Sequence, residues 1–350
     1  MRLSLRRADH GSLPPIELTE DEVVLALRNP RAAQERCVRR LGLDADQRRR
    51  DAGGPWLRVR PPRVPFAVPT GRELWAGEME RTVHETAEDL VERIDDYRPG
   101  VLESHVASMA PDALRSYLRM NVVRVVRVVE ALRRRGFESG AILEVGSWFG
   151  SFALALQRLG YDVVACDRYA TYGATFASYV DLLERDGVRV VSTMRENELR
   201  EIELLGEFDV VLAAAVIEHV PHTPRFLLET LFGNVRPGGL LLLDTPNLAR
   251  YWNRRALERG ATIFQPLQDQ YDCEPPWEGH HREYTPVELD WLLRRVGCVD
   301  VEVEFLDYNM LQFDELSSEH AECLAEIVRD PTQSDIILGV GTRPLRMEFN

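Results

Sequence analysis

The pattern of hydrophobic positions along the chain changes near residue 141. Before this point the clearest periodic segment is residues 112–135, where apolar side chains recur every three or four positions, as along one face of a helix. Asp112 can cap this helix, and Gly136 ends it. Beyond residue 141, short continuous apolar segments alternate with amphipathic ones. This alternation is typical of a parallel sheet that is covered by helices on both faces.

The second part of the chain is therefore predicted to alternate strands and helices. Strands are expected at residues 141–145, 162–166, 188–191, 208–213, 240–244, 299–306 and 335–340. Helices are expected at residues 151–159, 173–186, 224–232, 285–296 and 315–329. This order predicts an α/β fold of the Rossmann-like kind, with a doubly wound, mostly parallel sheet and an N-terminal, mainly helical extension.

The sequence suggests three parts. Residues 1–75 are expected to be an irregular N-terminal extension, residues 76–136 a helical cap, and residues 137–350 the Rossmann-like domain. Within the extension, short helices are expected at residues 19–27, where Thr19 and Glu22 can form a cap, and at residues 30–41. Within that domain, residues 245–284 form a long insertion rich in aromatic residues. Aromatic side chains on a long loop suggest a lid or pocket wall for a substrate, although packing of the loop against its own domain explains them equally well.

Composition and charge exclude several classes of function. The chain has 350 residues and a formal net charge of −14, which argues against nucleic-acid partners because phosphate backbones repel acidic surfaces. All 43 basic residues are arginine, so neither a Schiff-base lysine nor a phosphate-loop lysine is available. The five cysteines are scattered and form no C-x-x-C pair, so no disulfide framework or thiolate zinc site is expected.

The N-terminal residues carry no signal of membrane targeting. They are polar, with an arginine pair but no apolar segment behind it. The chain contains no apolar run as long as a membrane span. A cytoplasmic location without a membrane partner is therefore expected.

A pair of glycines marks the first predicted strand-to-helix turn. Gly146 and Gly150 allow a tight turn in which the backbone can approach a ligand closely, and the helix that follows offers free N–H groups. Asp167 ends the next predicted strand, where it can accept hydrogen bonds from a ribose. The spacing is G-x-x-x-G with the bulky Trp148 inside, which argues against a dinucleotide because a pyrophosphate needs G-x-G-x-x-G.

Several segments beyond residue 137 resemble the class I S-adenosylmethionine-dependent methyltransferases, in particular a small-molecule subgroup. The segments that carry the resemblance are Glu144–Gly150, Phe208–Val220 with its closing Glu-His-Val, Arg236–Gly239, Asp244–Asn247 with its Thr-Pro-Asn, and His281–Thr285. Together they span most of residues 137–345, in the order found in that subgroup.

The resemblance implies that S-adenosylmethionine is the cofactor. The residues implied to surround its methionine part are Glu144, Gly146, Ser147 and Gly150. Asp167 is similar to the family's ribose-binding acid. Two departures stand out: Trp148 replaces the usual middle glycine, and the family's adenine-contacting aspartate is not evident in residues 192–196.

Two histidines are candidates for catalysis. His219 follows the predicted strand 208–213, at the edge of the sheet where ligands bind. Its side chain can take a proton from a hydroxyl nucleophile, since an imidazole titrates near neutral pH. A metal-ligand role and a purely structural role remain alternatives. His281, at the end of the insertion, is the second candidate for the base.

A metal site is not predicted. Glu218, His219 and a later histidine are similar to the small-RNA 2′-O-methyltransferases, and that resemblance implies magnesium held by two glutamates and two histidines. Ala215 stands where one of those glutamates would be, and a hard cation prefers oxygen ligands.

The sequence thus predicts an enzyme that methylates an oxygen of a small polar, sugar or phenolic metabolite. N-methylation and a metal-assisted reaction like that of the 2′-O-methyltransferases are alternatives. A non-catalytic cofactor-binding interaction module is an alternative of another class, and a nicotinamide dehydrogenase is disfavoured by the glycine spacing. The expected partner is a small-molecule substrate, and a homodimer contact through the N-terminal part is compatible with the sequence.

Overall fold

The computed structural model describes residues 15–40, 58–69, 74–96, 111–194, 198–273 and 277–345. At its centre is a seven-stranded sheet with the order β6-β5-β4-β7-β8-β11-β9. The strands are β4 (Ala141–Val145), β5 (Asp162–Asp167), β6 (Arg189–Ser192), β7 (Phe208–Ala214), β8 (Val235–Pro246), β9 (Val299–Leu306) and β11 (Ile336–Thr342). In this sheet only β11 runs antiparallel to its neighbours. The predicted fold class, a doubly wound and mostly parallel sheet, is confirmed.

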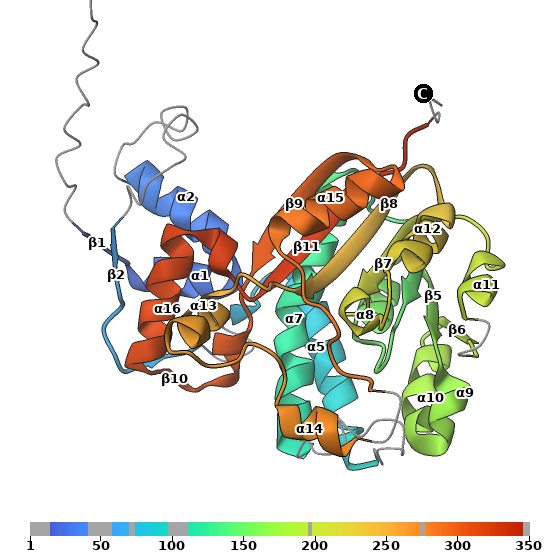
Figure 1. Cartoon of the computed structure of the whole chain (residues 1–350), viewed down its shortest axis with the longest axis horizontal. Helices are drawn as coiled ribbons and strands as arrows, with labels where there is room; N and C mark the ends of the chain where they lie inside the picture. The colour runs from blue at the N-terminus through green and yellow to red at the C-terminus, as the bar shows by residue number, and fades with distance from the viewer. Residues whose placement is uncertain are drawn as a thin grey trace, which may run out of the picture.

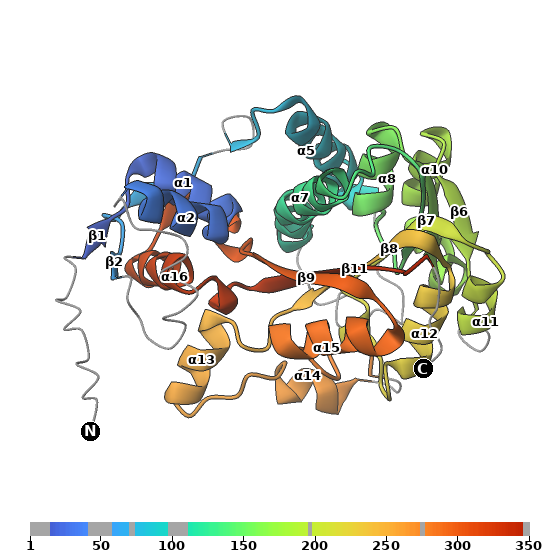
Figure 2. The ribbon, with the colours of Figure 1, turned by 90° about the horizontal axis from the view of Figure 1, so that it is seen from above.

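Helices cover both faces of the sheet, as Figure 2 shows. One face packs against α5 (Glu78–Val91), α7 (Pro111–Arg134), α8 (Ser151–Arg158) and α10 (Ala177–Arg185). The other face packs against α11 (Glu198–Glu203), α12 (Arg225–Gly233) and α15 (Pro286–Val296). Because the inner strands β4, β5 and β7 are covered on both sides, their apolar residues form continuous runs, whereas the edge strand β9 alternates apolar and acidic residues.

The helices of residues 76–136 share a hydrophobic core with the sheet. Leu118, Val125 and Leu132 of α7 are buried in the same cluster as Ile142 of β4 and Val163 of β5. The boundary expected at residue 136 therefore does not separate two cores. We accordingly treat α7 as a layer of the α/β domain, from which it also reaches the cavity described below.

The N-terminal segments pack beside the β9 edge of the sheet, against the C-terminal helix (Figure 1). The helices in this region are α1 (Glu20–Arg28), α2 (Pro30–Arg40) and α16 (Ser318–Arg329). Thr19 and Glu22 form a capping box at the start of α1. The helix predicted at residues 315–329 begins later than expected because Ser317 caps it. Where the N-terminal extension is described, it contains the two short helices predicted near residues 19–27 and 30–41, together with the predicted cap at Thr19.

The insertion of residues 245–284 contains α13 (Tyr251–Glu258) and α14 (Leu267–Asp272). Its aromatic residues do not share one surface. Tyr251 and Tyr284 are buried in two different cores, whereas Phe264 and Tyr271 are exposed. Trp277 alone among these aromatic residues lines the cavity described below. Packing within the protein therefore accounts for Tyr251 and Tyr284, and a role as a pocket wall for a substrate stays a prediction for Trp277.

The remaining elements are short. They are β1 (Ile16–Glu17), β2 (Val59–Arg60), β3 (Phe66–Ala67), β10 (Glu315–Leu316), α9 (Tyr169–Tyr172), η1 (Ile94–Asp96), η3 (Gly173–Phe176), η4 (Ile217–His219), η5 (Asn309–Gln312) and η6 (Pro331–Gln333). The segment Arg236–Gly239 lies within β8, where the pairing with β7 shifts register. Within the described ranges, no helix combines the length and apolar character needed to cross a bilayer.

Candidate active site

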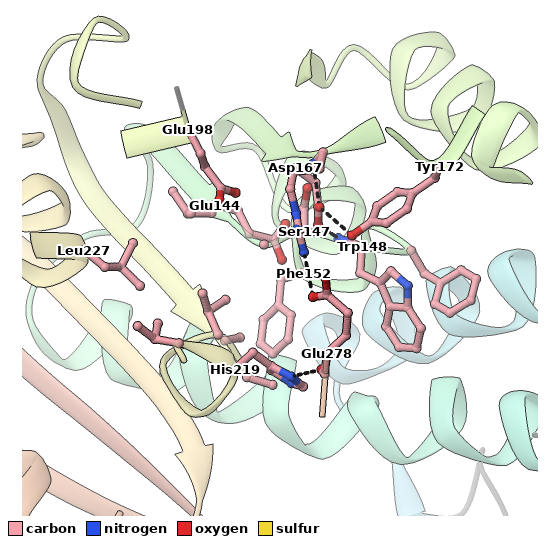
Figure 3. Close-up of a pocket in the computed structure, with 18 of the residues that line it drawn as sticks. Glu144, Ser147, Trp148, Phe152, Asp167, Tyr172, Glu198, His219, Leu227 and Glu278 are labelled. Atoms are coloured by element: carbon pink, nitrogen blue, oxygen red, sulfur yellow. Dashed lines mark hydrogen bonds and ion pairs between the residues drawn. The ribbon is translucent and has the colours of Figure 1, made fainter. Parts of the chain in front are cut away.

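A cavity of about 720 Å³ opens at the carboxyl ends of β4, β5 and β7 (Figure 3). The chain reverses its direction of winding between β4 and β7, because β5 and β6 lie to one side of β4 and the later strands to the other. Open α/β sheets bind their ligands at this point. The predicted cofactor residues Glu144, Gly146, Ser147 and Asp167 all line the cavity, as does His219.

The loop between β4 and α8 depends on its two glycines. Gly146 and Gly150 have φ angles of +76° and +79°, which residues with a side chain rarely adopt. A Cβ on Gly146 would lie 2.4 Å from Cγ2 of Val216. The backbone N–H of Gly146 donates to the carbonyl of Cys166 at 2.8 Å, which ties the loop to β5. Gly150, by contrast, does not line the cavity and serves the turn.

Asp167 is buried at the end of β5 and holds three donors. Its Oδ2 accepts from the N–H of Trp148 at 2.7 Å, and its Oδ1 accepts from the N–H of Arg168 at 2.6 Å. The hydroxyl of Tyr172 donates to Oδ1 at 3.2 Å. Burial raises the pKa of Asp167, while these hydrogen bonds oppose the shift. The carboxylate therefore fixes the loop at Trp148 as well as facing the cavity.

Glu144 is a buried carboxyl without a complete set of partners. It is 1% exposed, and its Oε2 has no hydrogen-bond partner among the described residues. Burial raises its pKa to about 8. A cationic group entering the cavity would satisfy this oxygen and favour the charged form. The amino group of a methionine-like ligand has the required charge.

His219 lies in η4, directly after β7, with its ring in the cavity. Its Nδ1 lies 2.7 Å from the carbonyl oxygen of Glu278, an interaction drawn in Figure 3. A carbonyl can only accept a hydrogen bond, so Nδ1 must carry the proton and the lone pair of the neutral ring lies on Nε2. This is the tautomer in which Nε2 can bind a proton or a metal ion.

The second predicted base, His281, lies outside this cavity. Its side chain is exposed, and its Nε2 lies 3.1 Å from the carbonyl oxygen of Trp277. The preceding residue, His280, faces His219 instead, with ring centroids 4.9 Å apart. The backbone N–H of His281 donates to the carbonyl of Glu218 at 2.7 Å, which fixes this arrangement.

Glu218 completes a group of three side chains with His219 and His280. The ligand atoms of the three lie within 4.8 Å of one another. Glu218 is 0% exposed; its Oε2 accepts from the hydroxyl of Thr245 at 3.0 Å, and its Oε1 has no partner among the described residues. Burial raises the pKa of Glu218 to about 7. We call these three residues the Glu218 cluster.

A second carboxylate orients the outer histidine of the cluster. Nδ1 of His280 lies 3.1 Å from Oε1 of Glu283, which also forms an ion pair with Arg250. Burial alone would raise the pKa of Glu283, but hydrogen bonds from His280 and Arg250 lower it to about 2. Glu283 is therefore ionised at neutral pH and can hold a proton on Nδ1 of His280.

Among the cavity residues that the sequence analysis missed are three from α7: Tyr117, Asn121 and Arg124. Arg124 is buried and donates to both carboxylate oxygens of Asp244, at 2.5 and 3.2 Å, and to Oδ1 of Asn121 at 2.9 Å. The sequence signal that could have identified these residues is that polar side chains interrupt the apolar stripe of α7. Burying an arginine requires a partner such as Asp244, and that partner lies 120 residues away in the sequence.

The segment Asp244–Asn247 positions the site rather than facing a ligand. Asp244 holds Arg124, and Thr245 holds Glu218. The side-chain amide of Asn247 donates to the carbonyls of Thr332 at 2.8 Å and Ser334 at 2.7 Å. The end of β8 thereby joins α7, the Glu218 cluster and the start of β11.

The profile of the methyltransferase domain family matches residues 115–303. The chain belongs to this family. The predicted resemblance to class I S-adenosylmethionine-dependent methyltransferases is confirmed, and with it S-adenosylmethionine as the cofactor. The match begins within α7, in agreement with the packing of that helix on the sheet.

Curated relatives of this methyltransferase domain are ubiquinone biosynthesis O-methyltransferases. That of Rickettsia felis is 28% identical over 131 residues, which are 37% of this chain and 51% of that protein. That of Rhodopseudomonas palustris is 29% identical over 204 residues, 55% of this chain and 75% of that protein. The chain spans about half the length of the first of these relatives.

Solved methyltransferase structures are similar at lower identity. Magnesium protoporphyrin IX methyltransferase of Synechocystis PCC 6803, with bound S-adenosylhomocysteine, is 14% identical with a TM-score of 0.41, covering 75% of this chain and 97% of that one. Phosphoethanolamine N-methyltransferase 2 of Haemonchus contortus, in complex with S-adenosylmethionine, is 15% identical with a TM-score of 0.39, covering 63% of this chain and 52% of that one.

Proposed function

We propose that this chain transfers a methyl group from S-adenosylmethionine to an oxygen atom of a small molecule. In this proposal Glu144 binds the amino group of the cofactor, and Asp167 binds its ribose. Gly146 and Ser147 leave room for the methionine part, and Gly150 maintains the turn. The unsatisfied Oε2 of Glu144 supports the first assignment because a buried carboxylate needs a cationic partner.

The acceptor binds beside His219, in the part of the cavity bounded by α7. Methyl transfer is an in-line displacement, so the protein contributes mainly by aligning the nucleophile with the methyl group; such alignment supplies roughly 7–11 kcal/mol in favourable cases. His219 takes the proton of the hydroxyl through Nε2. The single observation that carries this proposal is that His219, with its Nδ1 committed to a carbonyl, lines the same cavity as the cofactor residues. The names of the curated relatives support oxygen as the acceptor atom.

A two-step experiment tests this function. Mass spectrometry of the purified protein should first detect co-purified S-adenosylhomocysteine or S-adenosylmethionine, and calorimetry should give a dissociation constant for S-adenosylhomocysteine. Panels of phenols, sugars and amines are then compared by the rate at which S-adenosylhomocysteine forms. Turnover with hydroxyl acceptors supports the proposal. Turnover with amines alone would replace it with N-methylation, and binding without any turnover favours a cofactor-binding interaction module.

The Glu218 cluster favours a second candidate, a metal-assisted O-methylation. Both histidines have Nδ1 engaged by an acceptor, the Glu278 carbonyl for His219 and the Glu283 carboxylate for His280. Metal-binding histidines typically make this second contact, which directs the other ring nitrogen to the ion. Oε1 of Glu218 adds a buried oxygen without a partner among the described residues. A bound cation would lower the pKa of the acceptor hydroxyl, so that His219 would serve as a ligand instead of a base.

The donor set indicates which ions to test. Two imidazole nitrogens and one carboxylate suit zinc, iron or manganese better than magnesium, which prefers oxygen ligands. If the reaction is metal-assisted, elemental analysis of the wild-type protein after dialysis against each ion should find one equivalent of metal per chain. The variants Glu218→Ala and His280→Ala should lose this metal. His281→Ala is the matched control, because His281 is adjacent to His280 in the sequence but its imidazole lies outside the cluster. Full turnover in the presence of a chelator would restore His219 as the base.

A further inference from the structure

Trp148 has a backbone conformation that disfavours its own side chain. Its φ angle is +44°, and among the described residues only Ala215 and Asp300 share such an angle without being glycine. A bulky residue in this region is a true outlier, and it persists only where the surroundings fix it. Here the N–H of Trp148 donates to Asp167 at 2.7 Å, and its carbonyl accepts from the hydroxyl of Tyr169 at 2.9 Å.

The fixed backbone directs the indole to the side of the cavity that α7 forms. The ring is half-buried and lines the cavity. The ring of Tyr117, from α7, meets it edge-on with centroids 5.5 Å apart, and the ring of Phe149 lies 4.3 Å away on a tilted plane. Figure 3 shows Trp148 and Leu227 on opposite sides of the cavity. Aromatic neighbours on two sides hold the indole in one orientation.

The cofactor residues do not account for this side of the cavity. The lining there combines the aromatic rings of Tyr117 and Trp148 with the polar groups of Asn121 and Arg124. Arg124 is neutralised by Asp244, so this surface carries little net charge. Such a lining suits a flat, uncharged ring that carries hydroxyl groups better than a sugar, whose faces are covered with hydroxyls.

We propose that Trp148 is the specificity-determining residue of the acceptor site. Its indole forms the wall on which a planar hydroxylated aromatic ring packs, with one hydroxyl directed to His219. The inference rests on the proposed function and names the acceptor class for it. A glycine would occupy this position without backbone strain. The strained tryptophan is therefore explained by the wall that its indole provides for the acceptor.

The test compares Trp148→Gly with the wild type and with Trp148→Phe, using catechol and glucose as probes. Trp148→Gly relieves the left-handed strain and is expected to fold, which thermal melting checks. We expect its KM for catechol to rise at least tenfold, while the dissociation constant of S-adenosylhomocysteine changes less than threefold. Trp148→Phe should recover much of the loss. Trp291→Ala, an exposed tryptophan on α15 that is 59% exposed, is the control and should leave both quantities unchanged.

The outcomes separate this inference from the function on which it rests. Wild-type protein that binds S-adenosylhomocysteine but methylates only glucose would overturn the inference and leave O-methylation standing. An unchanged KM for catechol in Trp148→Gly, or a loss of cofactor affinity larger than the loss for catechol, would also overturn it. If the wild type fails to bind S-adenosylhomocysteine or to methylate any hydroxyl, the proposed function itself fails.

Discussion

The loop that follows β4 and the Glu218 cluster are built in different ways. The first joins residues between Glu144 and Asp167, which adjacent strands bring together. The second joins Glu218 and His219 to His280, about 60 residues further along, at the far end of an insertion. Each region contains a buried carboxyl with one oxygen that has no partner among the described residues. The first region can be recognised in the sequence, whereas the second is formed only when the insertion folds back.

The difference indicates which residues should affect cofactor affinity and which should affect turnover. In the proposed function the loop holds the cofactor through the geometry of its glycines and through Asp167, so changes at Gly146, Gly150 and Asp167 should act on cofactor affinity. Trp148 is the exception in this loop, because its side chain is proposed to face the acceptor. The acceptor is proposed to bind beside the cluster, so changes there should act on turnover and leave the cofactor bound. Variants that mix the two effects would contradict this division.

The largest effect is expected for Gly146→Val. The new side chain would collide with Val216 and would have to adopt a φ angle of +76°. We expect binding of S-adenosylhomocysteine to become undetectable by calorimetry, while circular dichroism shows a folded protein. Gly160→Ala is the control, because Gly160 is also left-handed but nothing lies within 4 Å of its Cβ position. Normal binding by the valine variant would mean that this loop does not approach the cofactor.

The next effect is expected for His219→Ala, in the cluster. Loss of a general base reduces turnover by roughly 10²–10⁴, and S-adenosylhomocysteine should bind with an affinity within twofold of the wild type. The exposed His281 supplies the matched control, since His281→Ala should retain full turnover. A folded His219→Ala variant with full activity would remove this residue from the mechanism.

A smaller effect is expected for Asp167→Ala, in the loop. Losing a charged acceptor for a ribose costs about 1.5–3 kcal/mol, so the affinity for S-adenosylhomocysteine should fall more than tenfold by calorimetry. Asp167→Asn keeps the size of the side chain and an oxygen that can accept from the N–H of Trp148, but it removes the negative charge. Comparing the two variants therefore separates the effect of the charge from the effect of positioning the loop. If both variants bind as the wild type does, the ribose does not contact this residue.

The smallest effect concerns stability and pH at Glu218. Its pKa is raised to about 7 in the folded protein, so its protonated form is favoured by folding. This contribution to stability is present below the ordinary pKa near 4.5 and is lost as pH rises through 7. Glu218→Gln should therefore increase the free energy of unfolding by about 1–3 kcal/mol at pH 8 and change it little at pH 4. Urea denaturation at the two pH values measures this difference, and a destabilised variant at pH 8 would indicate that a cation pairs with Glu218.

Much of the fold followed from sequence patterns. The alternation of apolar strand segments with amphipathic helices predicted the seven strands of the central sheet, and G-x-x-x-G predicted the loop after β4, because both patterns depend on neighbours in sequence. The sequence could not show whether α7 belongs to a separate cap or to the α/β domain, because a helix has one apolar stripe in either case. The start of α16 moved to Ser318 because a local cap at Ser317 determines it.

The sequence by itself determined the cofactor half of this protein: a strand, a glycine turn, a helix and an acid at the end of the next strand. Those residues are close in space because adjacent parallel strands end at the same edge of the sheet. Only the tertiary structure decided that His280, rather than His281, faces His219, and that Arg124 of α7 pairs with Asp244 at the end of β8. Such contacts join segments that no periodic pattern relates, and burial of charged groups against distant partners selects them.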